Sequence, residues 1–337
     1  MADTYQRIVL ASRPSGSVTP DNFRLERVPI PEVGESQLLV RNHYLSLDPY
    51  MRGRMETSKS YAAPQALDET MVGGTVGIVE TSRHPKFAVG DAVAGMFGWQ
   101  EYGLSDGTGL RKVDARQVPL SAYLGVLGMP GVTAWYGIRR ICAPRAGETV
   151  LVSAASGAVG SVAGQLAKQA GCRAIGIAGG AEKCAYVTGE LGFDACIDHR
   201  AHTDVRSMAD ALKQAAPDGI DAIFENVGGI GLDAALTRMN GFGRIALCGL
   251  IAGYEGGDIA IRNVRALLVM RLKLQGFIIT EHLEEWPAAL TDLVPAVTSG
   301  RLRYRESVAE GLASAPKAFM GMLHGRNFGK QLVKLVE

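Results

Sequence analysis

The sequence predicts an α/β chain in which a doubly wound parallel sheet is joined to a mostly β domain. From Glu148 onward, short apolar runs alternate with helical patterns, the rhythm of right-handed βαβ crossovers. Before about Leu120, short β-like runs alternate instead with Gly and Pro turns. The 337 residues are 47% hydrophobic, with 42 glycines, which suits an α/β protein rich in strand–helix turns.

The expected elements follow these two rhythms. In the N-terminal part, strands are expected near 37–42, 74–80 and 91–96. In the second part, a helix is expected at 161–170, and strands are expected at 149–154, 174–178, 195–198, 221–225, 244–248 and 273–279. The tail predicts a strand near 305–310, a helix near 316–323 and a strand at 331–336, and we expect it to return to the first domain.

Composition excludes several classes of function. The net charge is +1 and the 20% of charged residues mix both signs, so nucleic acid and acidic membranes are not expected as main partners. The first residues lack the pattern of a secretion signal, and no apolar run reaches the length of a membrane span. The five cysteines form no CxxC pair, which argues against a disulfide framework and predicts a cytoplasmic protein.

A glycine turn is the most informative motif. The apolar run 149–152 leads into Ala154-x-x-Gly157-x-x-Gly160, where alanine stands in place of the usual first glycine, and a helical pattern follows. Such a turn lets backbone N–H groups and the positive end of a helix hold a pyrophosphate. Gly157 allows close approach of the phosphates and Gly160 allows tight helix–strand packing. We therefore predict a dinucleotide site.

The choice of nucleotide depends on the end of the second strand of this part. An NAD site usually carries a carboxylate there, but this chain has Gly179 and Gly180, with Lys183 just beyond. A lysine can pair with a 2′-phosphate, so we predict NADP(H), although Lys183 could also be an ordinary surface lysine. Glu182 competes as a ribose ligand and is better explained as a first-turn helix residue.

Zinc is disfavoured as a cofactor. Its usual ligands are thiolate and imidazole, and the chain has no cysteine before Cys142. The six histidines show neither HxxxH nor HxH spacing. We expect no metal site.

Five stretches carry a family resemblance. They are 47–55 (LDPYMRGRM), 128–134 (GMPGVTA), the glycine turn, 225–229 (ENVGG) and 318–323 (AFMGML). In this order they resemble the zinc-independent medium-chain dehydrogenase/reductases, within them the prostaglandin/leukotriene reductases, plant double-bond reductases and bacterial curcumin-type reductases. The resemblance implies a GroES-like catalytic domain at 1–126 completed by 303–337, a Rossmann domain at 127–302, and an active site in the cleft between them.

The resemblance also implies how NADPH would be held. The pyrophosphate would lie on the glycine turn, the 2′-phosphate at Lys183, and the ribose or diphosphate at Asn226, while Asn327 would close over the cofactor. Backbone groups near the nicotinamide would come from Cys248, Gly249, Leu250, Phe277, Ile278 and Ile279, and those at the pyrophosphate from Gly157, Ala158, Val159 and Gly160. His199 stands where the family often has tyrosine. An imidazole can stack or donate and gains charge when protonated, so cofactor preference is expected to vary with pH.

The implied chemistry is hydride transfer from NADPH to the β-carbon of an α,β-unsaturated aldehyde or ketone, followed by protonation of the enolate. Tyr254, in the loop 249–257, is the first candidate for a donor to the enolate, and its alternative role is an aromatic lid. Tyr50 is the second candidate, alternatively a core aromatic of the β domain. Arg52 could bind an acidic substrate tail or form a structural ion pair.

Two other functions stay open. A quinone reductase would share the cofactor domain, and a nucleotide-binding regulator would keep the fold without turnover. By analogy with the family we also expect a homodimer in which the strand at 273–279 is an edge of the parallel sheet.

Overall fold

A computed structural model describes residues 4–336. The chain divides into two compact units. The first unit contains the described residues up to Gly125 and those from Glu306 onward, and the second runs from Val126 to Arg305. Each unit has its own sheet and its own core.

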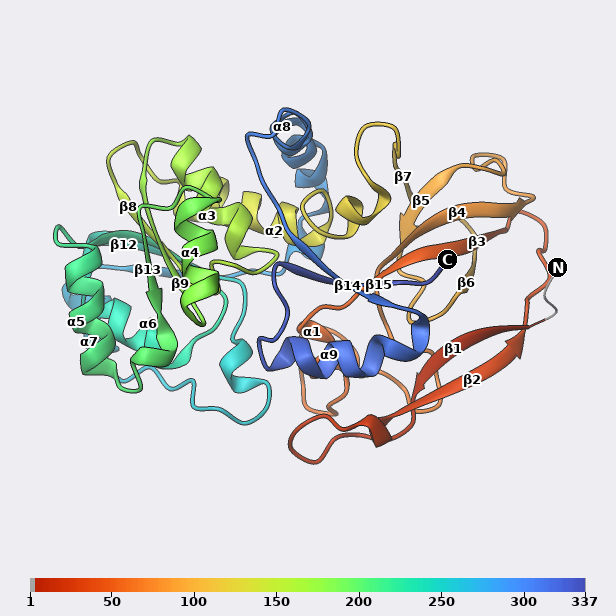
Figure 1. The fold of residues 1–337 in the computed structure, drawn as a ribbon, viewed down its shortest axis with the longest axis horizontal. Helices are drawn as coiled ribbons and strands as arrows, with labels where there is room; N and C mark the ends of the chain where they lie inside the picture. The colour runs from red at the N-terminus through yellow and green to blue at the C-terminus, as the bar shows by residue number, and fades with distance from the viewer. Residues whose placement is uncertain (1–3, 337) are drawn as a thin grey trace. The chain divides into compact units, whose positions relative to one another are not determined.

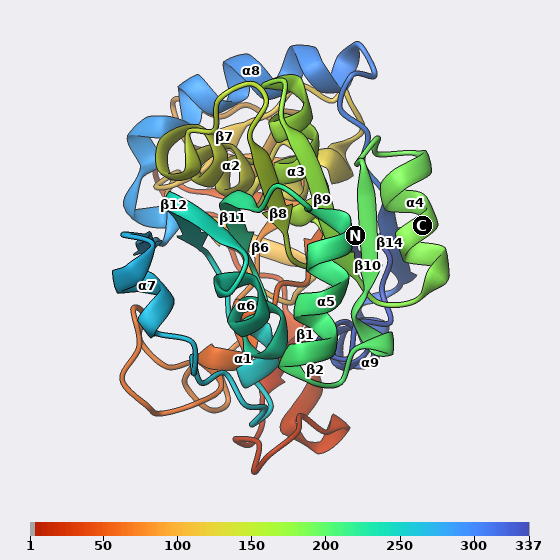
Figure 2. The ribbon, with the colours of Figure 1, turned by 90° about the vertical axis from the view of Figure 1, so that its left-hand side faces the viewer.

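The second unit is built on a parallel sheet. Within the described residues this sheet has six strands in the order β10-β9-β8-β11-β12-β13, which becomes 3-2-1-4-5-6 when they are numbered along the chain. Figure 2 shows the strands from β10 to β12 side by side. The strands are β8 (Thr149–Val152), β9 (Arg173–Ala178), β10 (Ala195–Asp198), β11 (Ile220–Glu225), β12 (Met239–Leu247) and β13 (Lys273–Gly276). This is the doubly wound order, so the predicted α/β class is confirmed. The strand order reverses between β8 and β11, where ligands bind in open parallel sheets.

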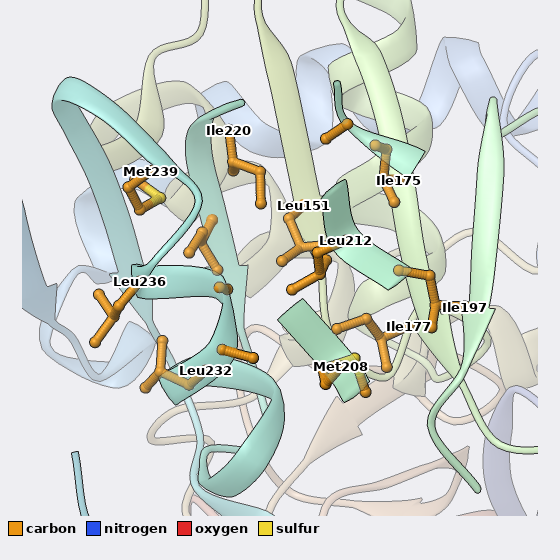
Figure 3. Packing of buried hydrophobic residues seen from close by; sticks show 14 of the residues in the cluster. Leu151, Ile175, Ile177, Ile197, Met208, Leu212, Ile220, Leu232, Leu236 and Met239 are labelled. Carbon is orange, nitrogen blue, oxygen red and sulfur yellow. The ribbon is translucent and has the colours of Figure 1, made fainter. Parts of the chain in front are cut away.

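Helices cover this sheet because its strands are apolar on both faces. They are α2 (Met129–Tyr136), α3 (Gly160–Gln169), α4 (Ala181–Gly189), α5 (Val205–Ala215), α6 (Gly229–Leu236), α7 (Arg265–Val269) and α8 (Trp286–Thr298). Met208 and Leu212 of α5 and Leu232 of α6 pack with Leu151 of β8 in one buried cluster (Figure 3). Each such side chain contributes about 1.5–3 kcal/mol to the free energy of unfolding.

The predicted strand at 273–279 is longer than the strand observed there. We expected 273–279, but β13 ends at Gly276 and a 3-10 turn follows at Ile279–Glu281. The neighbouring strand β12 ends at Leu247, so the backbone beyond Gly276 has no strand left to pair with. Ile279 is buried by the turn instead, which explains why its apolar character looked like strand.

The first unit is mostly β, as predicted. β1 (Thr4–Leu10) and β2 (Phe23–Pro29) form an antiparallel pair. In the described residues the larger sheet has seven strands in the order β14-β15-β3-β4-β5-β7, with β6 beside β3. They are β3 (Leu38–Ser46), β4 (Thr75–Ser82), β5 (Ala92–Gly95), β6 (Tyr102–Ser105), β7 (Arg111–Lys112), β14 (Glu306–Glu310) and β15 (Lys330–Lys334).

The C-terminal tail contributes to the sheet of the first unit. β15 lies antiparallel to β3, with Leu332 opposite Ser46, and β14 pairs with β15 in parallel (Figure 1). The helix α9 (Ala315–Leu323) connects them and places Phe319 in the core, 5.6 Å from the ring of Trp99. The short helix α1 (Tyr50–Arg54) follows β3. No helix formed by residues 4–336 has the length and apolar character that crossing a bilayer requires.

Candidate functional site

The glycine turn joins β8 to α3 at the point where the strand order reverses. Ala154 has φ +49°, the left-handed conformation that the usual first glycine supplies, at a cost of about 1–2 kcal/mol for an L-residue. The amide of Gly157 donates to the carbonyl of Ala154 at 2.9 Å and closes the turn. A Cβ at Gly160 would lie 2.3 Å from that carbonyl oxygen, so only glycine fits. The glycine-turn backbone is therefore kept although alanine occupies its first position.

This turn fits a diphosphate. The first amides of a helix have no preceding helical carbonyl to bond, and α3 is long enough to present a full N-terminal turn. Gly157 has no side chain to separate its backbone from a ligand, and a Cβ there would lie only 3.1 Å from the carbonyl oxygen of Ala154. Backbone donors together with the helix dipole can hold a phosphate group at this place.

A second corner lies where β9 and β10 end. Asp198 accepts hydrogen bonds at the same oxygen from the amides of Gly180, at 2.8 Å, and Arg200, at 3.0 Å. A Cβ at Gly179 would lie 2.8 Å from Nε2 of His199, and one at Gly180 would lie 3.1 Å from Nη1 of Arg200. The imidazole and the guanidinium therefore lie directly against the glycine pair.

Lys183 completes this basic corner, which we define as Lys183, His199 and Arg200. Burial lowers the pKa of Lys183, and the charge of Arg200 lowers it further. Partial burial likewise lowers the pKa of His199, with smaller contributions from Arg200 and Lys183, while Asp198 opposes the shift. The free protein thus favours a neutral His199 near pH 7 and holds two cations close together, an arrangement that a phosphate dianion would stabilise.

Sequence reasoning named Lys183 and His199 as candidates but did not name Arg200. The available signal was a basic residue directly after His199, at the end of the third strand of the parallel sheet. Glu182, the competing ribose ligand, is an exposed residue in the first turn of α4. Its position agrees with a favourable interaction with the helix dipole.

A buried hydrogen-bond network lies at the end of β11. Glu225 is 2% exposed, and its Oε1 accepts from Ser153 Oγ at 2.8 Å, from the amide of Val227 at 2.6 Å and from that of Gly228 at 2.7 Å. Burial raises the pKa of Glu225, and these hydrogen bonds oppose the rise. Glu225 lies in the stretch 225–229 that carries the family resemblance, but its hydrogen bond with Ser153 was not predicted, because it depends on the pairing of β8 with β11.

Asn226 extends this network to β12. Its Nδ2 donates to the carbonyl of Ser153 at 2.7 Å, and its Oδ1 accepts from the thiol of Cys248 at 2.9 Å. The side chain therefore joins the segments that follow β8, β11 and β12. An amide nitrogen has two donors, and one of them is committed to Ser153.

The loop after β12 carries Tyr254 and is anchored at both ends. Near its start, after Cys248, Gly249 and Leu250, the amides of Ile251 and Ala252 donate to the carbonyls of Asn226 and Val227 at 3.2 and 3.0 Å. Near its end, Asp233 of α6, 2% exposed, accepts from the amides of Arg262 and Asn263 at 2.8 and 2.7 Å. Tyr254 lies between these anchors, half-buried, directly after a 3-10 turn.

The segment 277–279 has two buried side chains and one half-buried side chain. The ring of Phe277 is buried and lies 5.3 Å from that of Tyr136. Its amide donates to the carbonyl of Leu247 at 3.3 Å. Ile278 is half-buried and Ile279 is buried, so the side chain of Ile279 belongs to the core of the second unit.

Three predicted residues belong to the first unit. Tyr50 begins α1 and packs against the buried core, and burial raises the pKa of its phenol. Arg52 is 4% exposed, donates to Glu56 at 2.5 Å and to the carbonyl of Gly16 at 2.8 Å, so the structural ion pair left open as an alternative is present. Asn327 precedes β15 and donates to the carbonyl of Gly329 at 2.8 Å.

The first unit also contains a buried ion pair that sequence reasoning missed. Lys330 Nζ donates to Asp48 at 2.6 Å and to the carbonyl of Leu47 at 2.8 Å, and both charged side chains are almost fully buried. Burial lowers the pKa of Lys330, and Asp48 opposes that shift. Ser46 donates to the other oxygen of Asp48. These contacts join β15 to the segment that leads into Tyr50.

Metal-ligating side chains do not gather in the described chain. Among residues 4–336, no group of three or more His, Cys, Asp or Glu side chains is placed to hold a metal ion. Within the same residues the five cysteines are free thiols.

The chain matches two known protein families and is similar to several oxidoreductases. Residues 6–113 match the family described as the N-terminal domain of oxidoreductase, and residues 158–294 match that described as zinc-binding dehydrogenase. The chain is 45% identical to the NADPH-dependent curcumin reductase of Escherichia coli (strain K12), covering 98% of this chain and 96% of the relative. It is 42% identical to the 2-alkenal reductase (NADP(+)-dependent) of Nicotiana tabacum, covering 97% and 96%. The crystal structure of CurA from Vibrio vulnificus in complex with NADPH superposes with a TM-score of 0.91 at 45% identity, covering 98% of this chain and 99% of that one.

Proposed function

The chain belongs to the zinc-independent branch of the medium-chain dehydrogenase/reductases, and from this premise we propose that it is an NADPH-dependent reductase of α,β-unsaturated aldehydes and ketones. The observation that supports the choice of NADPH as cofactor is the basic corner of Lys183, His199 and Arg200 at the ends of β9 and β10. The 2-alkenal reductase among the relatives supports reduction of a carbon–carbon double bond conjugated to a carbonyl group.

The residues that would hold NADPH lie mainly in the second unit. The turn of Gly157, Ala158, Val159 and Gly160 would bind the diphosphate, and the basic corner would bind the 2′-phosphate. Asn226 would bind the ribose or diphosphate through its remaining amide hydrogen, and backbone groups at 248–250 and 277–279 would border the nicotinamide. Asn327 remains a further candidate for a contact with the cofactor. When bound, NADPH supplies a hydride, so the protein need not supply a nucleophile of its own.

The remaining task for the protein is to stabilise charge on the substrate. Negative charge develops on the carbonyl oxygen during reduction, and a hydrogen-bond donor aimed at this oxygen stabilises it. We assign this role to the hydroxyl of Tyr254, because a phenol is protonated at neutral pH and both ends of its loop are anchored. Tyr50 is the alternative donor, and the raised pKa of its phenol keeps it protonated. Arg52 keeps its proposed role toward an acidic substrate tail only if its contacts with Glu56 and Gly16 open.

An assay of NADPH oxidation with enals, enones and quinones tests the proposal. We expect turnover of enals and enones with NADPH, well above that with NADH. Turnover of quinones alone would identify a quinone reductase instead. Tight NADPH binding without turnover of any acceptor would support a nucleotide-binding regulator.

We also propose that the protein works as a homodimer. β13 is an edge strand of the described sheet, and apolar side chains beside it are exposed, with Phe242 at 69% and Leu268 at 80%. The amide of Phe242 donates to the carbonyl of Met270 at 2.7 Å, which holds its loop close to the segment that enters β13. A second copy could pair with this edge and cover the apolar side chains. Light scattering should show a dimer that Leu268→Glu weakens, whereas a monomeric wild-type protein would contradict the proposal.

The free cysteines support a reducing compartment for this chain, and we propose the cytoplasm.

A further inference from the structure

Two cysteines of the second unit face each other. Cys196 of β10 donates its thiol hydrogen to the sulfur of Cys184 of α4, with 3.2 Å between the two sulfur atoms. Both side chains are half-buried, so a small reagent can reach them. The other three thiols of the described chain donate to oxygen instead: Cys142 to the carbonyl of Ile223, Cys172 to that of Arg145, and Cys248 to the side chain of Asn226.

This distance is longer than a disulfide bond but short enough for one to form after a small movement. A disulfide has sulfur atoms about 2.05 Å apart, so closing the pair requires an approach of about 1.2 Å. Cys184 lies in the first turn of α4, and Cys196 lies on the outermost strand of the parallel sheet. A first helical turn and an edge strand can adjust by this amount more easily than the centre of the sheet.

The hydrogen bond gives the two thiols different roles. Burial raises the pKa of both, but the contact lowers that of Cys184, the acceptor, and raises that of Cys196, the donor. A thiolate is the attacking species in disulfide exchange. The contact favours Cys184 as the attacking sulfur and Cys196 as the one that closes the bond, although burial raises the pKa of both thiols.

The pair lies next to the basic corner. Cys184 directly follows Lys183, and Cys196 precedes Asp198 by two residues on the same strand. Asp198 in turn bonds the amides of Gly180 and Arg200. A bond between the sulfurs would join the helix that carries Lys183 to the strand that leads into His199 and Arg200.

We propose that Cys184 and Cys196 are a site of reversible oxidation. A small-molecule disulfide oxidises the pair to an intramolecular disulfide bond, which weakens the binding of the 2′-phosphate of NADPH. The site itself stands on the sulfur geometry, whereas its effect on the cofactor rests on the proposed function. Drawing the first turn of α4 toward β10 displaces Lys183 from its place beside Arg200. By linkage, bound NADPH disfavours closure to the same extent.

The chemistry balances with glutathione disulfide as the oxidant. Cys184 sulfur attacks one sulfur of the reagent, whose S–S bond breaks, and one glutathione leaves with a proton as its thiol. Cys196 then attacks Cys184 sulfur and displaces the second glutathione, which takes the second proton. The two cysteines lose two electrons, and glutathione disulfide gains them.

Peptide mapping of the full-length protein tests the site without using cofactor. After treatment with glutathione disulfide, we expect a cross-linked peptide pair containing Cys184 and Cys196, which dithiothreitol separates. Cys196→Ser should stop at a glutathione adduct on Cys184, and Cys172→Ser is the matched control that should still cross-link. Absence of the cross-link in both the wild type and Cys172→Ser would overturn the proposal.

Equilibrium binding tests the effect on the cofactor. Oxidised protein should bind NADPH at least about 5-fold more weakly than reduced protein, with NADH binding unchanged, and Cys184→Ser should show no response to the reagent. A cross-link that leaves NADPH binding unaltered, or weakens NADH equally, would overturn the coupling. If reduced protein binds no NADPH at all, the proposed function fails while the mapping still reports on the thiol pair.

Discussion

Asp198 accepts a hydrogen bond from the amide of Gly180 at 2.8 Å, so the end of β10 holds the turn that begins α4. The same oxygen accepts from the amide of Arg200 at 3.0 Å. One carboxylate thus fixes the backbone on both sides of the basic corner while its own charge opposes the binding of a phosphate. These two effects can be separated by substitution.

Asp198→Asn keeps the acceptor and removes the charge, whereas Asp198→Ala removes both. We expect the Asn variant to bind NADPH at least as tightly as the wild type. The Ala variant loses both backbone hydrogen bonds and should bind about 5- to 30-fold more weakly than the Asn variant, since each bond contributes about 1 kcal/mol. Fluorescence titration with NADPH measures both constants, and equal affinities for the two variants would mean that these bonds do not order the corner.

Lys183→Ala and Arg200→Ala should each weaken NADPH binding by about 10- to 100-fold, because each removes a charged hydrogen bond to phosphate worth about 1.5–3 kcal/mol. NADH, which lacks the 2′-phosphate, should be little affected. Lys168→Ala is the matched control, since this lysine of the same unit pairs with Asp194. Equal losses for NADPH and NADH would show that the 2′-phosphate is held elsewhere.

Tyr254→Phe should lower kcat by about 100-fold, within the range for loss of one hydrogen-bond donor to a developing oxyanion. NADPH affinity should hardly change, because the lost hydrogen bond would act on the substrate oxygen. Steady-state kinetics on an enone and a binding titration separate the two effects. An unchanged kcat, with a loss in Tyr50→Phe instead, would move the donor role to Tyr50.

The raised pKa of Glu225 predicts that the free energy of unfolding depends on pH. Its pKa is raised in the folded protein, so its contribution to stability is present below the unfolded pKa of about 4.3 and is lost as the pH rises through the folded value. Glu225→Gln keeps an oxygen that can accept from Ser153, Val227 and Gly228 without titrating. In urea unfolding at a series of pH values, the free energy of unfolding of the variant should rise relative to that of the wild type as the pH increases above about 4.3. Parallel curves would contradict the assignment.

The ion pair of Lys330 and Asp48 predicts strong destabilisation when one partner is removed. Lys330→Met leaves a buried carboxylate without its cation and should cost about 3–5 kcal/mol of unfolding free energy. The double variant Lys330→Met/Asp48→Asn should recover much of this loss, because no buried charge remains. Thermal and urea unfolding provide the measurement, and a double variant no more stable than Lys330→Met would be evidence against a charge effect.

Elements defined by a local residue pattern could be predicted from the sequence. The run at 195–198 predicted β10 to the residue, because a short apolar segment between polar turns defines a strand by itself. The end of β13 was misjudged because it is set by where β12 stops, and that cannot be read from the residues of β13.

The candidate site was readable only in part. The glycines and Lys183 were identified from their local spacing. The alanine at position 154 was also evident in the sequence, but its left-handed backbone conformation was not. The contact between Asp48 and Lys330 spans 282 positions and depends on the pairing of β15 with β3. Such contacts arise from topology, so no window of sequence contains them.

The pairing of β15 with β3 has a consequence for synthesis. Ribosomes extend a chain at about 5–20 residues per second, so β3 emerges roughly 15–60 s before the strand that completes its sheet. The nucleotide-binding unit, continuous from Val126 to Arg305, can finish folding during that interval. Until β15 has emerged, β3 lacks this partner, and such an unpaired strand edge is exposed to aggregation and to chaperone capture.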